Sequence, residues 1–309
     1  METIGFIGTG VMGASIVKHL LSSGYKVNVY NRTKSKTDEL VDLGAVWKET
    51  PKSVAEASEL IFTMVGFPED VKEVYYGENG IFNGVQPDSI LVDLTTSKPS
   101  LAEEIYQTAK EKGVSSLDAP VSGGDLGARN GTVTTMVGGD EAAFEKVKPV
   151  FMTFSGTLEL QGPAGSGQHT KMANQIMIAG TMTGLTELLV YAKAAGLNLE
   201  KVLKTVGGGS AANWSLQNYG PRILKEDYSA GFFVKHYIKD LGIALAEAEK
   251  LGIHLPATEN AKRLYDQLKE ELENSKYPLR AGNHIEDRGS MLNFSVIGRD
   301  CSLEERLDY

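Results

Sequence analysis

Hydrophobic positions in the first half of the chain fall into short β-branched runs that alternate with helical stretches. Strands are predicted at residues 3–7, 26–30, 45–47, 60–65, 89–94 and 115–118. Two further runs, 132–137 and 157–161, are expected to extend the sheet at one edge. Strands that alternate with helices predict an α/β fold with a doubly wound parallel sheet. Such a sheet binds its ligands beyond the carboxyl ends of its strands.

The second half of the chain has helical periodicity. Its longest run, residues 166–195, contains no proline and spans roughly 45 Å at 1.5 Å per residue. Further helices are predicted at 199–206, 238–250 and 257–272, and the last carries an apolar stripe that is typical of a buried face. A glycine run at 207–210 is either an interhelical turn or a pocket-forming loop. The pattern predicts a nucleotide-binding domain over residues 1–164 and an all-helical domain over 165–309, with an irregular tail from about residue 274.

Composition excludes several classes of partner. The 309 residues carry a net charge of -9 and a pI near 5.2, so no broad basic surface is available for nucleic acid or an anionic membrane. The single Cys301 cannot form an internal disulfide, and no apolar run reaches the roughly 18 residues of a membrane span. The histidines lack a paired ligand spacing, so no metal site is predicted. We expect a soluble, cytoplasmic protein.

The first predicted strand runs into the glycine-rich turn Gly8-Thr-Gly10-Val-Met-Gly13 and then into an apolar helix. This order is typical of a dinucleotide-binding fingerprint. Gly8 suits a tight turn, Gly10 the close approach of a pyrophosphate, and Gly13 the packing of helix on strand. The positions predicted to contact a cofactor here are Gly8, Gly10, Val11, Met12 and Gly13. The alternative, a glycine turn without a ligand, is disfavoured because the next strand completes a βαβ unit.

The second strand ends in Asn31-Arg32-Thr33-Lys34, at the point where an NAD-specific fold offers a carboxylate to the ribose hydroxyls. An arginine, a hydroxyl and a lysine suit a 2′-phosphate instead, whose charge a carboxylate would repel. Asn31, Arg32 and Thr33 are therefore predicted to contact NADP, with NAD as the second choice. The alternative is that Arg32 and Lys34 only open a solvated helix.

Further polar segments follow the later strands and open the long helix. Val65 ends one predicted strand, Thr96 follows another, and Ser122-Gly123-Gly124 follows a third. A serine beside two glycines can present hydroxyl and backbone donors to a substrate carboxylate, although a plain glycine loop has the same pattern. In the long helix, Lys171, Asn174 and Gln175 are spaced i, i+3, i+4, so their side chains share one face and can point into a cleft.

Together with Ile238-Lys239-Asp240, these motifs make the chain resemble the β-hydroxyacid dehydrogenases, which include 3-hydroxyisobutyrate dehydrogenase, tartronate semialdehyde reductase and the glyoxylate/succinic semialdehyde reductases. The resemblance covers about residues 3–272. It implies a Rossmann domain joined through the long helix to an all-helical domain, with the active site between them. It also implies an NAD(P)-dependent oxidoreductase that interconverts a small carboxylate-bearing β-hydroxyacid and its semialdehyde, and a homo-oligomer, dimer or tetramer, formed through the helical domain.

The resemblance assigns chemistry to individual residues. Lys171 matches the catalytic lysine, and Ser122 with Gly123 matches the carboxylate-binding loop. Lys171 would protonate the alkoxide that forms on hydride transfer, or accept the hydroxyl proton in reverse. A free lysine has a pKa near 10.4, so burial near a cation must lower that pKa for base catalysis. Lys239, which matches a cofactor-contacting residue, could supply that cation.

Other matches concern the substrate pocket. Thr96 matches a residue close to substrate and nicotinamide, while Asp240 and Phe232 match residues that line the pocket. Asn174 and Gln175 stand where many members have Asn-Asn, and the Asn-Gln pair is similar to the tartronate semialdehyde reductase branch.

Two alternatives to this enzyme stay open. An imine reductase-like enzyme resembles the family but usually lacks the lysine, so Lys171 counts against it. A catalytically silent NADP-binding scaffold would be expected to lose Lys171 while keeping the glycine turn.

The segment around Trp214 helps to shape the substrate site in the resembling family, which makes Trp214 a candidate for specificity. Residues 277–309 depart from the family, because its closing Gly-Thr-Gln turn and last helix are not found there.

Overall fold

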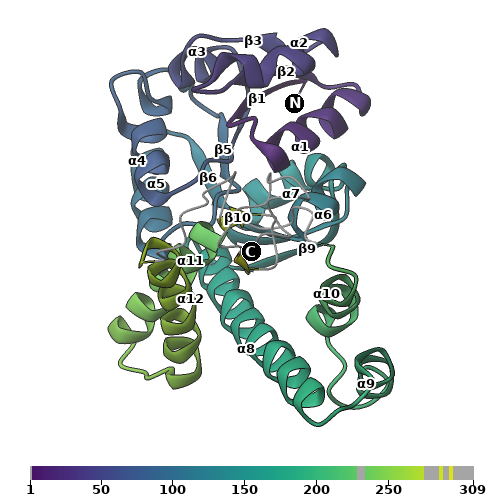
Figure 1. The fold of residues 1–309 in the computed structure, drawn as a ribbon. Coiled ribbons are helices and arrows are strands. Elements are labelled where there is room, and N and C mark those ends of the chain that lie inside the picture. Colours follow the sequence, from purple (N-terminus) through teal and green to yellow (C-terminus); the bar gives the residue numbers. More distant parts are fainter. Residues whose placement is uncertain (1, 228–233, 275–284, 288–291, 295–309) are drawn as a thin grey trace. The chain divides into compact units, whose positions relative to one another are not determined.

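A computed structural model of the chain describes residues 2–227, 234–274, 285–287 and 292–294 (Figure 1). The chain forms two compact units, Met1–Lys171 and Met172–Tyr309. The long helix α8, Ser166–Ala194, begins in the first unit and continues in the second.

The first unit is built on a nine-stranded sheet in the order β3-β2-β1-β4-β5-β6-β8-β7, with β9 paired to β8. Its strands are β1 Thr3–Ile7, β2 Lys26–Tyr30, β3 Val46–Trp47, β4 Leu60–Thr63, β5 Ile90–Asp93, β6 Ser115–Asp118, β7 Val121–Ser122, β8 Val133–Gly139 and β9 Ser155–Gly162. The strands from β3 to β6 are parallel, and β8 runs antiparallel to β6 and β7. The strand order reverses between β1 and β4, as in doubly wound dinucleotide-binding sheets, which confirms the predicted fold class.

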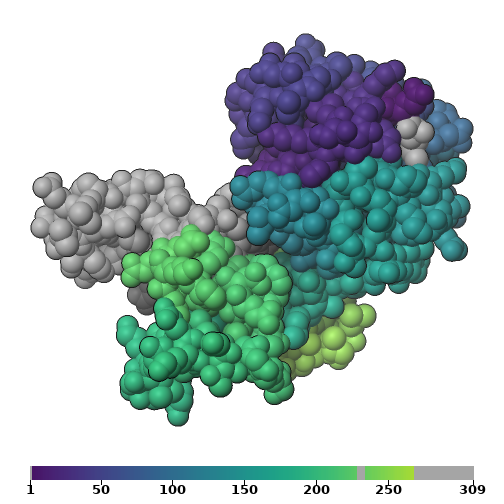
Figure 2. All heavy atoms as spheres, turned by 90° about the vertical axis from the view of Figure 1, so that its right-hand side faces the viewer, coloured from purple at the N-terminus to yellow at the C-terminus, as the bar shows by residue number. Residues whose placement is uncertain are grey.

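Helices cover both faces of this sheet because its buried strands send alternate side chains into two apolar layers. Phe6 and Phe62 enter one layer, whereas their neighbours Ile7 and Ile61 enter the other. The first layer is covered by α1 Val11–Ser22, α2 Asp38–Asp42, α6 Gly124–Asn130 and α7 Glu141–Phe151, and the second by α3 Pro51–Glu56, α4 Pro68–Tyr76 and α5 Pro99–Glu111. In the space-filling view, the early segments in purple lie directly against later ones in teal (Figure 2). Within this unit, α1 packs on α6.

The second unit is helical, with two pairs of helices packed on different parts of α8 (Figure 1). Toward the end of α8, Leu185 and Leu189 pack with side chains of α9, Leu199–Val206, and α10, Trp214–Leu224. Nearer its start, Ala179 packs with Tyr237 and Leu241 of α11, Val234–Lys250, and with Ala261 of α12, Pro256–Asn274. These contacts confirm the prediction of a helical second domain, to which two short strands are added near the end of the chain.

Several elements differ from the sequence-based expectation. The glycine run at 207–210 is not one of them, because it lies between α9 and α10 as the interhelical-turn alternative requires. Asn213 then caps α10 by accepting a hydrogen bond from the Leu216 N–H at 2.9 Å. Helix α6 and strand β7 were missed, since β7 ends at Ser122 and α6 begins at Gly124, inside the serine-glycine segment that we interpreted as loop. The tail was expected to be irregular, yet β10, Ile285–Asp287, pairs antiparallel with β11, Leu292–Phe294, so that expectation was wrong for these residues. Three-residue strands carry too little periodicity to be found from sequence.

A tyrosine in the helical unit provides a test of its packing. Tyr265 contacts Tyr237 edge-on, with 5.1 Å between ring centroids, and burial raises the pKa of Tyr265 to about 12, with a smaller effect from Tyr219. The folded protein therefore holds this proton more tightly than the unfolded chain, whose tyrosine pKa is about 10. The resulting stabilisation is fully present below about pH 10 and is lost as the pH rises through about 12.

We predict that spectrophotometric titration of Tyr265→Phe lacks one late-titrating phenolate. We also predict that the unfolding free energy of the variant falls less steeply than that of the wild type at high pH. The exposed Tyr191→Phe is the control. A titration curve for Tyr265→Phe that loses a group near pH 10 instead would contradict the assignment.

Candidate active site

The turn between β1 and α1 has the geometry of a phosphate cradle. Gly8 has a φ of +100°, and a Cβ there would collide with the carbonyl of Met64, while a Cβ on Gly13 would collide with the carbonyl of Gly8. Gly10, by contrast, has no atom within 4 Å of the position that a Cβ would occupy. The N-terminus of α1 carries no side-chain cap and no acidic residue in its first turn. Its N–H groups and partial positive charge therefore fit the pyrophosphate of a dinucleotide above Gly10.

The segment after β2 combines an internal brace with exposed cations. Asn31 Oδ1 accepts a hydrogen bond from the Thr9 N–H at 3.2 Å, and Asn31 Nδ2 donates to the Thr33 carbonyl at 2.9 Å. The Arg32 side chain is 86% exposed and reaches a carboxylate oxygen of Asp70 at 3.4 Å. Asn31 thus fixes the backbone, and Arg32 presents its guanidinium to solvent.

A second cation is held beside the first. Lys34 Nζ lies 4.3 Å from the centre of the Trp47 ring, a cation–π contact that limits where the ammonium can move. Lys34 opens a short 3-10 helix, Lys34–Thr37, as the solvated-helix alternative required. The segment therefore carries positive charge that suits a phosphate. Lys34 also has a structural role, because it begins the 3-10 helix and contacts Trp47.

Hydrogen bonds tie the ends of the central strands together. Thr95 N–H donates to Asp93 Oδ1 at 3.0 Å, and Val65 N–H donates to Thr95 Oγ1 at 3.0 Å. The β4 and β5 ends, which carry Val65 and Thr96, are thereby fixed relative to each other. Thr96 itself is partly exposed between the buried Thr95 and Ser97.

The predicted carboxylate-binding residues surround the start of α6. Ser122 ends β7, while Gly123 and Gly124 have φ values of +129° and +60° and turn the chain into the helix. Only glycine adopts the first of these conformations without strain. Helix α6 is also braced on α1, because the His19 ring nitrogen Nε2 lies 3.0 Å from the carbonyl oxygen of Ala128. The loop and the glycine turn of the fingerprint therefore rest on packed neighbouring helices.

Lys171 lies beside this loop. Its side chain is buried, with 5% of the residue exposed, and its Nζ donates to the Val121 carbonyl at 2.9 Å. Val121 immediately precedes Ser122, so the structure brings together a buried amine and the serine-glycine loop, two features separated by about 50 positions.

Asn174, Gln175, Lys239 and Asp240 belong to the helical unit and form one polar chain. Asn174 Nδ2 donates to Gln175 Oε1 at 2.8 Å, and Gln175 Nε2 donates to Asp240 Oδ2 at 2.6 Å. Lys239 Nζ lies 3.1 Å from Asp240 Oδ1. Asp240 has no exposed surface in this structure, and Gln175 is 1% exposed, so the pair is an internal brace that leaves Asn174 partly exposed.

Other predicted residues are placed as follows. Phe232 lies outside the described residues. Trp214 is 57% exposed at the start of α10, where its ring packs edge-on against Tyr219. Its part in specificity stays a prediction.

Two polar residues that sequence reasoning left without a role hold the start of α8. Asp118 Oδ1 accepts a hydrogen bond from the Gly165 N–H and its Oδ2 one from the Gln168 N–H, both at 2.8 Å. Burial raises the pKa of Asp118, and these N–H groups partly offset that effect. The Gln168 side chain is fully buried and bonds to the β5 end. The only sequence signal was the position of Asp118 at the end of a strand.

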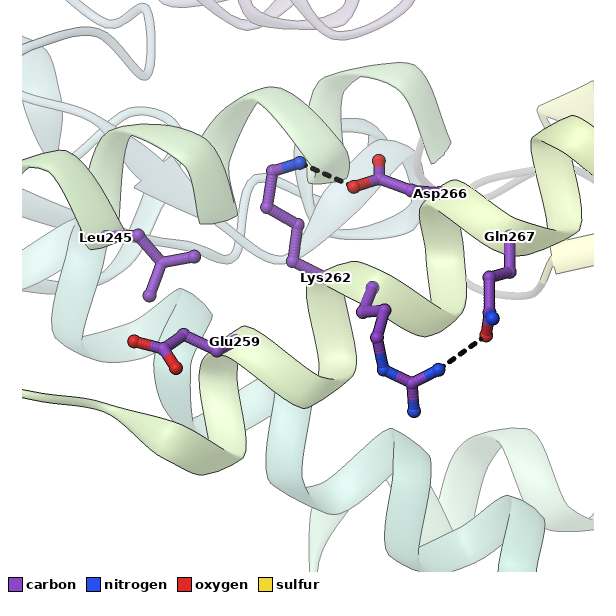
Figure 3. Close-up of a pocket in the computed structure, with 6 residues that line it drawn as sticks. Leu245, Glu259, Lys262, Asp266 and Gln267 are labelled. Atoms are coloured by element: carbon purple, nitrogen blue, oxygen red, sulfur yellow. Dashed lines mark hydrogen bonds and ion pairs between the residues drawn. The ribbon is translucent and has the colours of Figure 1, made fainter.

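A hollow on the helical unit lies apart from these residues. It is formed by α11 and α12 and lined by Leu245, Glu259, Lys262, Arg263, Asp266 and Gln267 (Figure 3). Its cations are engaged along their own helix, with Lys262 Nζ 2.6 Å from Asp266 and Arg263 Nη1 2.8 Å from Gln267. The hollow contains none of the predicted site residues.

Among the described residues, no cluster of three metal-ligating side chains is found and no helix is long and apolar enough to cross a membrane.

Two family models match this chain, one in each half. Residues 3–162 match the family described as the NAD binding domain of 6-phosphogluconate dehydrogenase, and residues 165–277 match the one described as NAD-binding of NADP-dependent 3-hydroxyisobutyrate dehydrogenase. The chain belongs to the 3-hydroxyisobutyrate dehydrogenase-like family. This confirms the resemblance drawn from the motifs. As a member of the β-hydroxyacid dehydrogenases, the protein is an NAD(P)-dependent oxidoreductase.

Several relatives are similar over most of their length. An uncharacterized oxidoreductase of Bacillus subtilis is 52% identical over 86% of this chain and 93% of its own. The 2-hydroxy-3-oxopropionate reductase of Escherichia coli is 39% identical over 85% of this chain and 90% of its own. Among solved structures, 3-hydroxyisobutyrate dehydrogenase of Mycobacterium tuberculosis with L-serine superimposes with a TM-score of 0.81 at 26% identity, over 88% of this chain and 94% of its own.

The glycine turn gives a prediction that separates binding from folding. Gly10 has an ordinary φ of -71° and open space around it, so Gly10→Ala should leave thermal stability unchanged. The added methyl occupies the predicted phosphate position, and the affinity for NADPH should fall by about tenfold or more, equivalent to about 1.4 kcal/mol. Gly13→Ala, in contrast, should destabilise the fold by about 1–3 kcal/mol through overpacking.

Thermal unfolding and fluorescence titration with NADPH check both variants. If Gly10→Ala binds NADPH as the wild type does, the cradle above Gly10 is not the phosphate site.

Proposed function

We propose that the protein is an NADP-preferring reductase of a small carboxylate-bearing semialdehyde, or in reverse a dehydrogenase of the matching β-hydroxyacid. The observation that carries this proposal is the buried amine of Lys171, held against Val121 beside the Ser122 loop. When bound, the nicotinamide cofactor supplies or accepts the hydride. Every other part of the reaction is assigned to side chains and backbone groups of the chain.

Lys171 has the role of general acid in reduction. A hydride added to the aldehyde carbon leaves its electron pair on the carbonyl oxygen, which takes a proton from the Lys171 ammonium as the alcohol forms. The amine then regains a proton from solvent. An ammonium has three donors, so the bond from Nζ to the Val121 carbonyl can orient the group while another N–H faces the substrate oxygen. Positioned acids of this kind contribute about 10²- to 10⁴-fold in rate.

The segment from Ser122 to Gly124 is assigned to the substrate carboxylate. The Ser122 hydroxyl and the N–H groups at the turn into α6 are donors without a fixed negative charge of their own. A carboxylate bound here would lie next to Lys171, since Val121 joins the two features. This proximity limits the substrate to one in which few bonds separate carboxylate and carbonyl.

Residues of the helical unit are assigned roles that the family resemblance implies. Asn174 is the partly exposed end of the chain that runs through Gln175 to Asp240, and we assign it to a substrate hydroxyl or to the orientation of Lys171. Lys239 is assigned to the cofactor, and Phe232 to the pocket wall. Thr96 and Val65 are assigned to the nicotinamide end of the cofactor.

NADP preference is proposed from the end of β2. Arg32 and Lys34 provide two cations, and Thr33 a hydroxyl, where NAD-specific folds have a carboxylate. A 2′-phosphate at this point would compete with Asp70 for Arg32. A homo-oligomeric state and a cytoplasmic location are kept as expectations from the sequence.

The catalytic assignment predicts a selective loss on substitution of Lys171. In Lys171→Ala, kcat should fall by about 10²- to 10⁴-fold, because the general acid is removed while the nucleotide cradle is untouched. Steady-state kinetics and NADPH titration measure the two effects separately. Lys193→Ala, an exposed lysine on the same helix, is the matched control. Turnover by Lys171→Ala within a few-fold of the control would end the assignment.

The cofactor assignment predicts a different loss for Arg32→Ala. Removing a charge-assisted hydrogen bond should weaken NADPH binding by about 1.5–3 kcal/mol, roughly 10- to 100-fold, and leave NADH binding unchanged. Lys26→Ala, an exposed cation at the opposite end of β2, is the control. Equal losses for both nucleotides would refute a 2′-phosphate contact.

The substrate class is tested by a panel. Glyoxylate, succinic semialdehyde, tartronate semialdehyde and 3-hydroxyisobutyrate should be assayed with both NADP and NAD forms. We expect turnover of at least one, with NADP favoured. A silent scaffold would bind NADPH and oxidise none with any member of the panel. An imine reductase-like enzyme would reduce a cyclic imine instead.

A further inference from the structure

The first turn of α8 is seated on the carboxyl ends of β5 and β6 by two buried side chains. The Asp118 carboxylate, 4% exposed, accepts the N–H groups of Gly165 and Gln168, and thereby satisfies donors that have no partner inside the helix. Negative charge at a helix N-terminus is stabilised further by the helix dipole. Together these contacts fix where the helix begins.

Close packing around Asp118 requires glycine at positions next to the start of α8. A Cβ on Gly138 or on Gly167 would collide with the Asp118 carboxylate or with the backbone around it. The second glycine of the Gly165-x-Gly pair is therefore required by contact with Asp118, and the first by its φ of +89°. The helix cannot approach β6 in this manner with a larger residue at Gly138 or Gly167.

Gln168 connects the seat to the loop after β5. Its Nε2 donates to the Thr95 carbonyl at 2.8 Å, and its Oε1 accepts from the Ser97 N–H at 2.9 Å. The two bonds use opposite ends of one amide and lie on either side of Thr96. No part of Gln168 is exposed, so its role is not contact with a ligand.

We propose that Gln168 and Asp118 are positioning residues that place Lys171 for proton transfer, an inference that rests on the proposed function. Lys171 follows Gln168 by three residues, so the two side chains lie on nearly the same face of α8 and about 4.5 Å apart along its axis. Any shift or rotation of the first turn moves Nζ away from the Val121 carbonyl. Gln168 also fixes the position of Thr96 relative to Lys171. Its side chain bonds to both neighbours of Thr96, and the Gln168 backbone N–H donates to Asp118.

The main variant is Gln168→Met, which keeps the side-chain volume and removes both amide bonds. We expect kcat to fall by about 10- to 100-fold, the cost of a misplacement of about 1 Å. The NADPH dissociation constant should stay close to that of the wild type, and the pH profile of kcat should shift. Asp118→Asn is the second variant, with the same expected direction, and carries the test if Gln168→Met does not fold. His169→Ala, the exposed neighbour on the same turn, is the control and should match the wild type in all readouts.

A second readout does not depend on catalysis. The rate at which an amine-specific reagent modifies Lys171, measured by peptide mass spectrometry, should rise in Gln168→Met and stay unchanged in His169→Ala. If no substrate of the panel is turned over by the wild type, the proposed function fails, yet this rate still tests the positioning. A folded Gln168→Met with the kcat, pH profile and modification rate of the wild type would overturn the inference.

Discussion

A buried carboxylate at a helix N-terminus is the contact on which the proposed chemistry depends. Asp118 ends β6 and accepts two N–H groups from the start of α8, a helix that provides Lys171 one turn later. An ionised group with this little exposure would be costly on its own, and the surrounding donors are what make it tolerable. Because the lysine stem projects from the seated turn, its amine is placed by backbone contacts before any ligand arrives.

The same logic of close approach explains the glycines around the proposed site. Gly8 and Gly13 are required by the packing of β1, β4 and α1, whereas Gly10 leaves space that the fold itself does not need. Gly167 belongs to the first kind, since its missing side chain makes room for Asp118. A motif that looks uniform in sequence thus combines two glycines that packing requires with one, Gly10, that packing does not require.

Much of the fold was predicted from the amino-acid sequence. Strands β1, β2 and β6 begin and end as predicted. Two of them, β1 and β2, contain β-branched residues and end at turn residues. Helix α10 was missed because Gly220 and Pro221 stand inside it and hide its periodicity. The partners of Asp118 and Gln168 lie about 50 to 70 positions away, so no local pattern could reveal them. Lys171 was identified from its sequence motif, whereas the contacts that hold it are seen only in the structure.

The most direct test of this account is a crystal structure of the protein with NADPH and an unreactive hydroxyacid bound together. We expect Nζ of Lys171 within about 2.6–3.2 Å of the ligand's hydroxyl oxygen, as proton transfer requires, with the Asp118 and Gln168 bonds intact. The ligand carboxylate should lie on Ser122 and Gly123. A ligand bound elsewhere, with no substrate oxygen within reach of the Lys171 amine, would contradict the central claim.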